Sequence, residues 1–216
     1  MPAQRLPHGY TNASWLDGER VRKQYLGEDA GARMRTELDA IKHAADRVPV
    51  PLVLDVDDRA NVVTFARVSG RHGQDLVDEG QAGRVLKAAG RTLRTLQSGQ
   101  SRPMPVHGDF GPQNLLLDSL TMEVVVVLDW EFAHHGDPTE DLAWAEWIVR
   151  THHPPATTDL ASLFAGYGQE PPWSARRSLM LAACQRLEMR ARRLGDDHAA
   201  ELWQRREALT AGWQPP

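Results

Sequence analysis

The stretch VHGDFGPQN (106–114), followed by LDWE (128–131), decides the fold of this chain. Asp109 and Asn114 are five positions apart on a predicted loop, and Asp129 follows a run rich in valine that is typical of a buried strand. This layout allows one carboxylate to contact a substrate hydroxyl while an amide oxygen and a second carboxylate face a hard cation. Magnesium takes oxygen ligands and keeps several waters, so two protein ligands plus phosphate oxygens suffice to hold it.

The residues before this stretch predict a small β-rich lobe with one helix. Asp17-Gly18 is a strong two-residue turn signal between two β-prone runs. In the second run, Lys23 falls on the same face as Val21 and Tyr25. We expect strands at 13–16, 19–25, 52–57 and 61–66, and a helix at 30–47.

A predicted linker separates this lobe from the rest of the chain. Residues 67–80 lose the periodicity and carry three glycines. Beyond them, apolar residues recur at helical spacing, and we expect helix starts at Thr139, Thr158, Ser174 and at Asp196 or Asp197. The predicted fold class is α+β, with a small antiparallel-β lobe at 1–66, a hinge at 67–80 and a larger, mainly helical lobe at 81–216.

The two deciding segments resemble the conserved motif and the metal-site Asp of the aminoglycoside phosphotransferase and choline kinase superfamily. These small-molecule kinases share the protein-kinase fold. The resemblance extends outward to GDPTEDLAW (136–144) and to LPHGYTNASWL (6–16), which is similar to a phosphate loop. The matches span about two-thirds of the chain. The resemblance implies a two-lobed kinase that moves the γ-phosphate of ATP or GTP to a hydroxyl of a small molecule.

The resemblance also implies a role for each matching residue. Asp109 would position and deprotonate the acceptor hydroxyl, and Asn114 and Asp129 would hold Mg²⁺ against the nucleotide phosphates. Lys23 would contact the α- and β-phosphates and pair with Glu37. Backbone near 66–68 would bind the adenine. The residues expected around the nucleotide are Gly9, Tyr10, Thr11, Asn12, Lys23, Glu37, Ala66 and Val68.

Two features depart from the family pattern. The loop HGYTN has one glycine where phosphate loops often have two or three. Arg22 precedes Lys23, so a register slip by one residue would exchange their faces. The chain is also short for the superfamily, and we expect the missing length in the acceptor-binding helices.

Composition limits the classes of partner. The 216 residues include 25 Lys and Arg against 29 Asp and Glu, a net charge of −4, which argues against a general nucleic-acid binder. The longest apolar runs are too short to span a membrane. The single cysteine, Cys184, excludes an internal disulfide, so we expect a soluble, cytoplasmic protein with a nucleotide and a small acceptor as its ligands.

Several alternatives stay open at this point. Nine acids against one base between 109 and 150 favour a divalent metal and a cationic acceptor. Trp144 and Trp147 line an acceptor pocket or pack in the core. The arginines at 186, 190 and 193 share a helical face that is either a solvated surface or a site for an anionic acceptor or a partner chain.

Two other functional classes compete with a kinase. A kinase-like module without catalysis would bind nucleotide or regulate a partner. A metal-dependent hydrolase built on the pairs His134-His135 and His152-His153 would contain zinc or iron. Adjacent histidines point in different directions, which favours reading both pairs as exposed loop residues.

Overall fold

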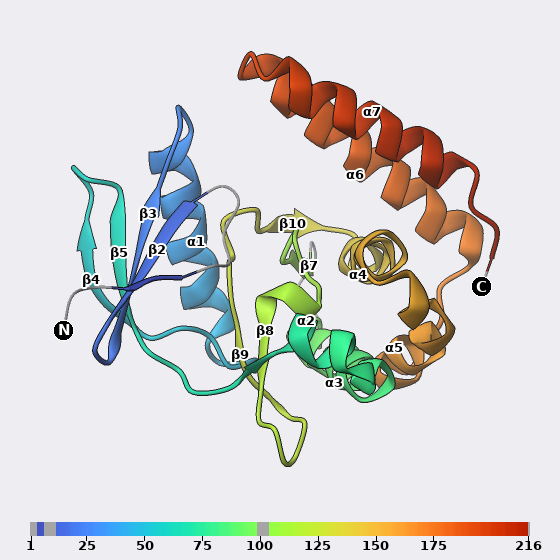
Figure 1. Cartoon of the computed structure of the whole chain (residues 1–216), viewed down its shortest axis with the longest axis horizontal. Helices are drawn as coiled ribbons and strands as arrows, with labels where there is room; N and C mark the ends of the chain where they lie inside the picture. The colour runs from blue at the N-terminus through green and yellow to red at the C-terminus, as the bar shows by residue number, and fades with distance from the viewer. Residues whose placement is uncertain (1–3, 7–11, 99–103, 216) are drawn as a thin grey trace.

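A computed structural model of the chain describes residues 4–6, 12–98 and 104–215. Figure 1 shows a β-sheet with one helix on one side of the molecule and a larger helical part on the other. This arrangement confirms the predicted α+β, two-lobed architecture. The residue limits of the two lobes and of the hinge stay predictions.

The small lobe contains a five-stranded antiparallel sheet in the order β1-β2-β3-β5-β4. The hairpin between β2 and β3 pairs Asp17 with Arg20, so its loop is Gly18–Glu19, one residue later than predicted. Gly18 has a φ of +59°, which glycine adopts without steric cost. The strands are β1 (Gln4–Arg5), β2 (Asn12–Asp17), β3 (Arg20–Tyr25), β4 (Val53–Asp57) and β5 (Val62–Ala66).

Helix α1 (Ala30–Ala44) packs on this sheet and ends three residues before the predicted boundary at Arg47. Its buried face includes Met34, Ile41 and also the charged Glu37. Lys23 on β3 is buried while Arg22 is exposed, so the predicted register of this strand is correct.

Within the predicted linker, residues 67–80, regular structure begins at Arg71. Strand β6 (Arg71–His72) pairs with β8, and α2 (Gly73–Leu76) and the π-helix η1 (Val77–Gln81) follow at once. The segment therefore packs into the large lobe from Arg71 onward. Short elements with little periodicity give a weak signal, and the tertiary contacts decide their conformation.

The large lobe is mainly helical, with two small sheets at its junction with the small lobe. One sheet has the order β6-β8-β9, and the other pairs β7 with β10. The elements are α3 (Ala82–Leu96), β7 (Met104–Val106), η2 (Pro112–Asn114), β8 (Leu115–Leu117), β9 (Val124–Val127), β10 (His134–Gly136), α4 (Thr139–His152), η3 (Pro154–Asp159), α5 (Leu160–Tyr167), α6 (Trp173–Arg193) and α7 (Asp197–Ala211).

The ends of the helices differ in part from the expected caps. Asp196 accepts a hydrogen bond from the backbone N–H of Ala199 and caps α7 as predicted. At α4, the cap position belongs to Pro138, and the Asp137 carboxylate accepts the N–H of Thr139. The predicted cap at Thr139 is therefore wrong.

Helices α6 and α7 lie side by side and cover α4 (Figure 1). Their contact with α4 forms a second apolar cluster, apart from the main core, that includes Trp144, Trp147, Met180 and the single cysteine, Cys184. No helix in the part of the chain that the structure describes has the length and apolarity needed to cross a membrane.

Candidate active site

The loop between β7 and η2 is held in one conformation from within. Gly108 has a φ of +83°, and a Cβ at this position would overlap the carbonyl oxygen of Phe132. The ring of His107 accepts the N–H of Asp109 at Nδ1, 3.3 Å away, and its Nε2 lies 2.9 Å from the carbonyl oxygen of Leu128. Burial lowers the pKa of His107 to about 4, so the ring is neutral and braces the loop.

Asp141, at the start of α4, fixes the same loop from the other side. Its carboxylate accepts the backbone N–H groups of His107 at 2.8 Å and Gly108 at 3.0 Å. Burial raises the pKa of Asp141 to about 6, against these two hydrogen bonds that favour the charged form. Its contacts are those of a loop support.

These supports hold Asp109 at the mouth of a cavity. Trp144 donates from Nε1 to its Oδ1 at 2.8 Å, and Asn114 donates from Nδ2 to its Oδ2 at 3.0 Å. Loss of surrounding water raises the pKa of the Asp109 carboxyl to about 7, with smaller contributions from the negative charges of Asp129 and Glu131. A carboxylate with this proton affinity suits proton acceptance at neutral pH.

The β8–β9 hairpin brings Asn114 and Asp129 together. Asn114 directly precedes β8, and Asp129 lies two residues after the end of β9. The N–H of Leu128, between β9 and Asp129, donates to the carbonyl oxygen of Asn114 at 2.8 Å. Asp129 has a φ of +64°, a left-handed conformation that aspartate tolerates better than most residues. The two expected metal ligands therefore lie next to each other, at the same end of the paired strands β8 and β9.

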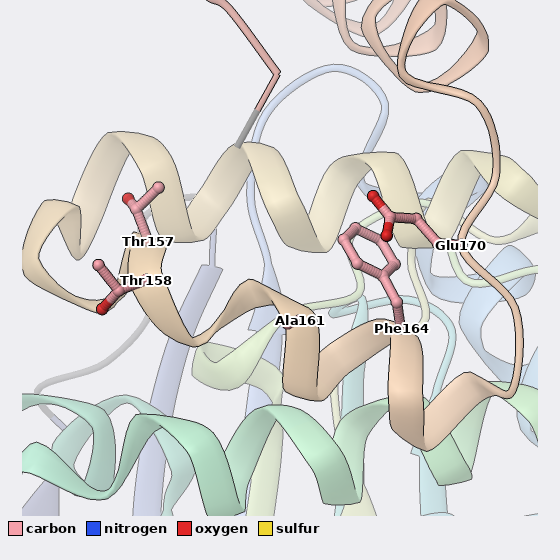
Figure 2. Close-up of a pocket in the computed structure, with 5 residues that line it drawn as sticks. All are labelled: Thr157, Thr158, Ala161, Phe164 and Glu170. Atoms are coloured by element: carbon pink, nitrogen blue, oxygen red, sulfur yellow. The ribbon is translucent and has the colours of Figure 1, made fainter.

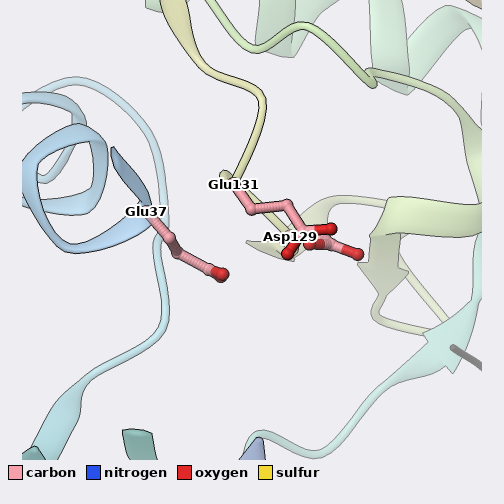
Figure 3. A group of neighbouring side chains, drawn as sticks. All are labelled: Glu37, Asp129 and Glu131. Carbon is pink, nitrogen blue, oxygen red and sulfur yellow. The ribbon is translucent and has the colours of Figure 1, made fainter. Parts of the chain in front are cut away.

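Lys23 joins the sheet of the small lobe to this segment. Its Nζ lies 2.5 Å from Glu37 Oε2, 2.7 Å from Asp129 Oδ1 and 3.8 Å from Glu131 Oε2. Figure 3 shows the three acidic side chains converging, Glu37 from α1 and the other two from the segment after β9. Burial alone would lower the pKa of Lys23, but the three carboxylates raise it above its ordinary value, so the ammonium stays charged.

Glu131 and Arg33 form a second ion pair that the sequence analysis did not assign to the site. Arg33 on α1 donates from Nη1 to Glu131 Oε2 at 2.6 Å and to Asn12 Oδ1 at 2.8 Å, and Asn12 donates to Glu131 at 2.7 Å. Arg33 and Glu131 are 98 positions apart in the chain. Glu131 belongs to the LDWE segment that the sequence singles out. Its partner Arg33 is too far away in the chain for any spacing pattern to relate the two residues.

The network continues from the small lobe to α6. The Asp29 carboxylate accepts Arg33 Nε at 2.8 Å and Arg190 Nη2 at 2.6 Å. Arg190 is the middle residue of the predicted arginine face, so this position is neither simply solvated nor unpaired. Its guanidinium also lies over the ring of Phe132, 5.3 Å from the centroid.

The expected nucleotide contacts are only partly described. Gly9, Tyr10 and Thr11 lie outside the described residues, and Asn12 is buried in the Arg33 network. The N–H of Ala66 already donates to the carbonyl oxygen of Leu52. Val68, the other residue expected near the adenine, is half-buried and lies two residues after the end of β5.

A cavity of about 1030 Å³ opens beside Asp109, between the loop that joins β7 to η2 and helices α4, α6 and α7. Trp144 and Trp147 line it, with rings stacked 4.5 Å apart at an angle of 2°. The two indoles therefore pack in the second apolar cluster, as one sequence interpretation expects, and they also line the cavity. The exposed Arg186 and the half-buried Arg190 line it as well.

A second cavity, of about 430 Å³, lies at α5 and η3 (Figure 2). Its lining consists of Thr157, Thr158, Ala161, Phe164 and Glu170. Among the described residues, none of these five forms a hydrogen bond or ion pair with the loop that joins β7 to η2. We assign it no function.

The paired histidines do not form a metal centre among the described residues, where the only group of potential ligands is Glu37, Asp129 and Glu131. His134 and His135 are exposed on β10, as expected. In the second pair, His152 is exposed, as expected, and packs edge-on against Trp147. His153 is buried and lies 2.9 Å from Asp78, so the prediction is wrong for this residue alone.

Comparison with known proteins identifies the class. The model of the phosphotransferase enzyme family matches residues 2–105 and 98–179, and the chain belongs to this family. Over 46 residues, or 21% of the chain, it is 46% identical to Acyl-CoA dehydrogenase family member 10 of Mus musculus, and the match spans 4% of that protein.

Solved structures of similar fold include antibiotic and choline kinases. The chain aligns with a thermostable mutant of aminoglycoside phosphotransferase APH(4)-Ia at a TM-score of 0.73 and 17% identity, covering 97% of this chain and 94% of that one. A choline/ethanolamine kinase family protein from Mesorhizobium loti aligns at a TM-score of 0.70 and 16% identity, covering 99% and 89%. These similarities confirm the fold.

Proposed function

We propose that this protein transfers the γ-phosphate of ATP or GTP to a hydroxyl group of a small molecule. The observation that carries the proposal is the contact of 2.7 Å between Lys23 Nζ and Asp129 Oδ1. It joins the sheet of the small lobe to the segment after β9, beside a loop whose aspartate opens on a large cavity. A similar structure, APH(4)-Ia, forms a ternary complex with AMP-PNP and hygromycin B.

In this proposal the nucleotide binds between the lobe at 1–66 and the lobe at 81–216, with 67–80 as hinge. Lys23, fixed by Glu37, contacts the α- and β-phosphates, while backbone near Gly9, Tyr10, Thr11 and Asn12 covers them. The adenine meets the backbone near Ala66 and Val68. Because Lys23 is already charged and oriented by its acids, it needs little rearrangement to meet a phosphate.

Asn114 and Asp129 offer the oxygen donors that suit Mg²⁺, and Asp129 is only half-buried, so these two residues would hold the ion. Bound there, Mg²⁺ supplies positive charge against the phosphate oxygens. Glu37 and Glu131 are engaged by Lys23 and Arg33, and they act on the position of those cations.

Asp109 orients the acceptor. The hydroxyl oxygen forms a bond to the γ-phosphorus, the bond from that phosphorus to the bridging oxygen breaks, and the nucleoside diphosphate leaves with the electron pair. The hydroxyl proton passes to Asp109. Trp144 and Asn114 hold the carboxylate in place, so positioning rather than strong basicity supplies most of its effect.

Replacement of single acids tests the assignment. Asp109→Ala should abolish transfer with little change in ATP affinity, whereas Asp129→Ala should remove Mg²⁺-dependent ATP binding in calorimetry. Asp46→Ala, which alters an exposed acid after α1, is the control. Unchanged turnover in Asp109→Ala would contradict the proposal.

A panel of hydroxyl compounds, scored by ATP consumption, tests the activity itself. It should include aminoglycosides, amino alcohols and sugars. ATP binding without consumption for any acceptor would indicate the alternative, a nucleotide-binding or regulatory module.

The buried thiol of Cys184 agrees with a protein that works in the reducing cytoplasm.

A further inference from the structure

We propose that the acceptor is an anionic hydroxyl compound: a molecule with a flat, apolar body and a carboxylate that Arg206 binds. The inference rests on the proposed function, since the hydroxyl is the group that meets Asp109. It concerns the wall of the 1030 Å³ cavity that α6 and α7 contribute, together with the end of α4.

Aromatic side chains build a platform along this cavity. Trp144 and Trp147 are stacked, and the ring of Trp203 on α7 lies 6.1 Å from the first and 5.6 Å from the second. Apolar side chains of α6 and α7, among them Leu187 and Leu202, line the same space. Surfaces of this kind bind a planar or apolar body by burying its area.

Arg206 gives this platform a positive charge. Its guanidinium lies 4.5 Å from the centroid of Trp203 and 5.5 Å from that of Trp147. Within the described chain its guanidinium has no recorded hydrogen bond or ion pair, and it lines the cavity. A guanidinium held on aromatic faces keeps its fork of N–H donors directed for a carboxylate.

The acids that line the cavity are already engaged by the protein. Asp141 accepts two backbone N–H groups, Glu140 lies 3.4 Å from Arg186, and Asp78 lies 2.9 Å from His153. Asp196 caps α7. The acid-rich composition that favoured a cationic acceptor therefore serves internal contacts in this region.

His152 shares the Trp147 side of the cavity with Arg206. It packs edge-on against Trp147, 5.9 Å between centroids, and lines the cavity. Burial, together with the charges of Arg206 and His153, lowers the pKa of His152. The Asp109 carboxylate thus lies at one end of the aromatic platform, beside Trp144, and the Arg206 guanidinium lies over Trp147 and Trp203.

The chemistry of transfer is unchanged by this choice of acceptor. The acceptor hydroxyl oxygen bonds to the γ-phosphorus of the nucleoside triphosphate, the diphosphate leaves with the electron pair of the broken bond, and the proton goes to Asp109. The carboxylate takes no part in bond making. It forms charge-assisted hydrogen bonds with Arg206 and sets which end of the acceptor faces the base.

Three matched probes test the inference by calorimetric binding to the whole protein. Each is a hydroxymethyl-biphenyl, and the far ring carries a carboxylate, a carboxamide or an aminomethyl group. We expect the carboxylate to bind about tenfold more tightly than the aminomethyl compound, with the carboxamide between them. Equal binding, tighter binding of the aminomethyl compound, or no saturable binding of the carboxylate overturns the inference.

Variants locate the effect. Arg206→Gln should reduce the preference for the carboxylate by about tenfold, and Arg206→Lys, which keeps the charge but loses the planar fork, should keep only part of it. Arg205→Gln, which alters the exposed neighbour paired with Glu201, should leave the preference unchanged. An unchanged preference in a folded Arg206→Gln protein contradicts the assignment, and the probe series on the wild-type protein decides the matter if that variant unfolds.

The binding assay requires no phosphate transfer, so the two proposals can fail separately. A preference for the carboxylate without ATP consumption for any hydroxyl compound overturns the kinase function and retains the specificity. ATP consumption that depends on Asp109 but favours the aminomethyl probe retains the kinase function and overturns the anionic acceptor.

Discussion

The indole N–H of Trp144 donates to Oδ1 of Asp109 at 2.8 Å, and the ring behind that N–H belongs to the aromatic platform of the cavity. The same side chain therefore orients the candidate base and forms part of the cavity wall. A carboxylate fixed by an indole on one oxygen and an amide on the other has little freedom to rotate away from a hydroxyl.

Trp144→Phe should separate orientation from binding. Loss of the N–H leaves the apolar wall in place but frees one carboxylate oxygen, so we expect kcat to fall about tenfold with little change in ATP affinity. Trp147→Phe is the matched variant, because its Nε1 donates to Thr210 and not to Asp109. An equal loss of kcat in both variants would contradict the orienting role.

Lys23→Met should lower the free energy of unfolding by about 3 kcal/mol, because it leaves buried carboxylates without their cation. The double variant Lys23→Met/Glu37→Gln should recover part of that loss by removing one of these charges. Urea unfolding of the wild-type protein and of both variants measures the difference. Equal stability of all three proteins would show that the ion pairs of Lys23 with Glu37, Asp129 and Glu131 contribute little to the free energy of unfolding.

Gly108→Ala should reduce stability by at least about 2 kcal/mol and abolish activity, because alanine resists a φ of +83° and its Cβ would overlap the Phe132 carbonyl. Gly111→Ala is the control in the same loop. Its backbone is extended, and the new Cβ would meet only the end of the flexible Gln113 side chain. Thermal unfolding and turnover compare the two, and the loop geometry is refuted if Gly108→Ala is the milder change.

Asp141→Asn should change how stability depends on pH. The pKa of Asp141 is raised from 3.8 to about 6 in the folded protein, so its stabilising effect is present below the lower value and is lost as the pH rises through about 6. Relative to Asp141→Asn, the wild-type protein should lose about 3 kcal/mol between about pH 4 and pH 7. Comparison of the two proteins by urea unfolding cancels the other groups, and a constant difference across this range would disprove the shift.

The parts of the site that lie close in the chain were accessible from the sequence. Asp109 and Asn114 share one loop, and alternation along β3 correctly places Lys23 inward, facing Glu37. The pairing of Arg33 with Glu131 joins residues 98 positions apart, and no periodicity relates them. Contacts of this kind depend on how the lobes meet.

The elements between the lobes were the least predictable. The run at 67–80 was predicted as a linker, and the sequence gives no sign that it contains β6, which adds to the sheet of β8 and β9, and α2, which follows it. A strand of two residues is too short to show an alternation of buried and exposed side chains in the sequence. Strand β6 therefore depends on its pairing with the backbone of β8. In the same way, the burial of His153 beside Asp78 depends on a contact with this segment, 75 positions away in the chain.

The chain of contacts from Arg190 through Asp29 and Arg33 to Glu131 connects the wall of the 1030 Å³ cavity with the segment that carries Asp129. If an acceptor displaces Arg190 from Asp29, the ion pairs that hold the phosphate side of the cleft change with it. Thermodynamic linkage then makes the effect mutual: the factor by which one substrate alters the affinity of the second equals the factor in the opposite direction. Under the proposed function, the nucleotide and the acceptor would therefore bind cooperatively, each changing the affinity of the protein for the other.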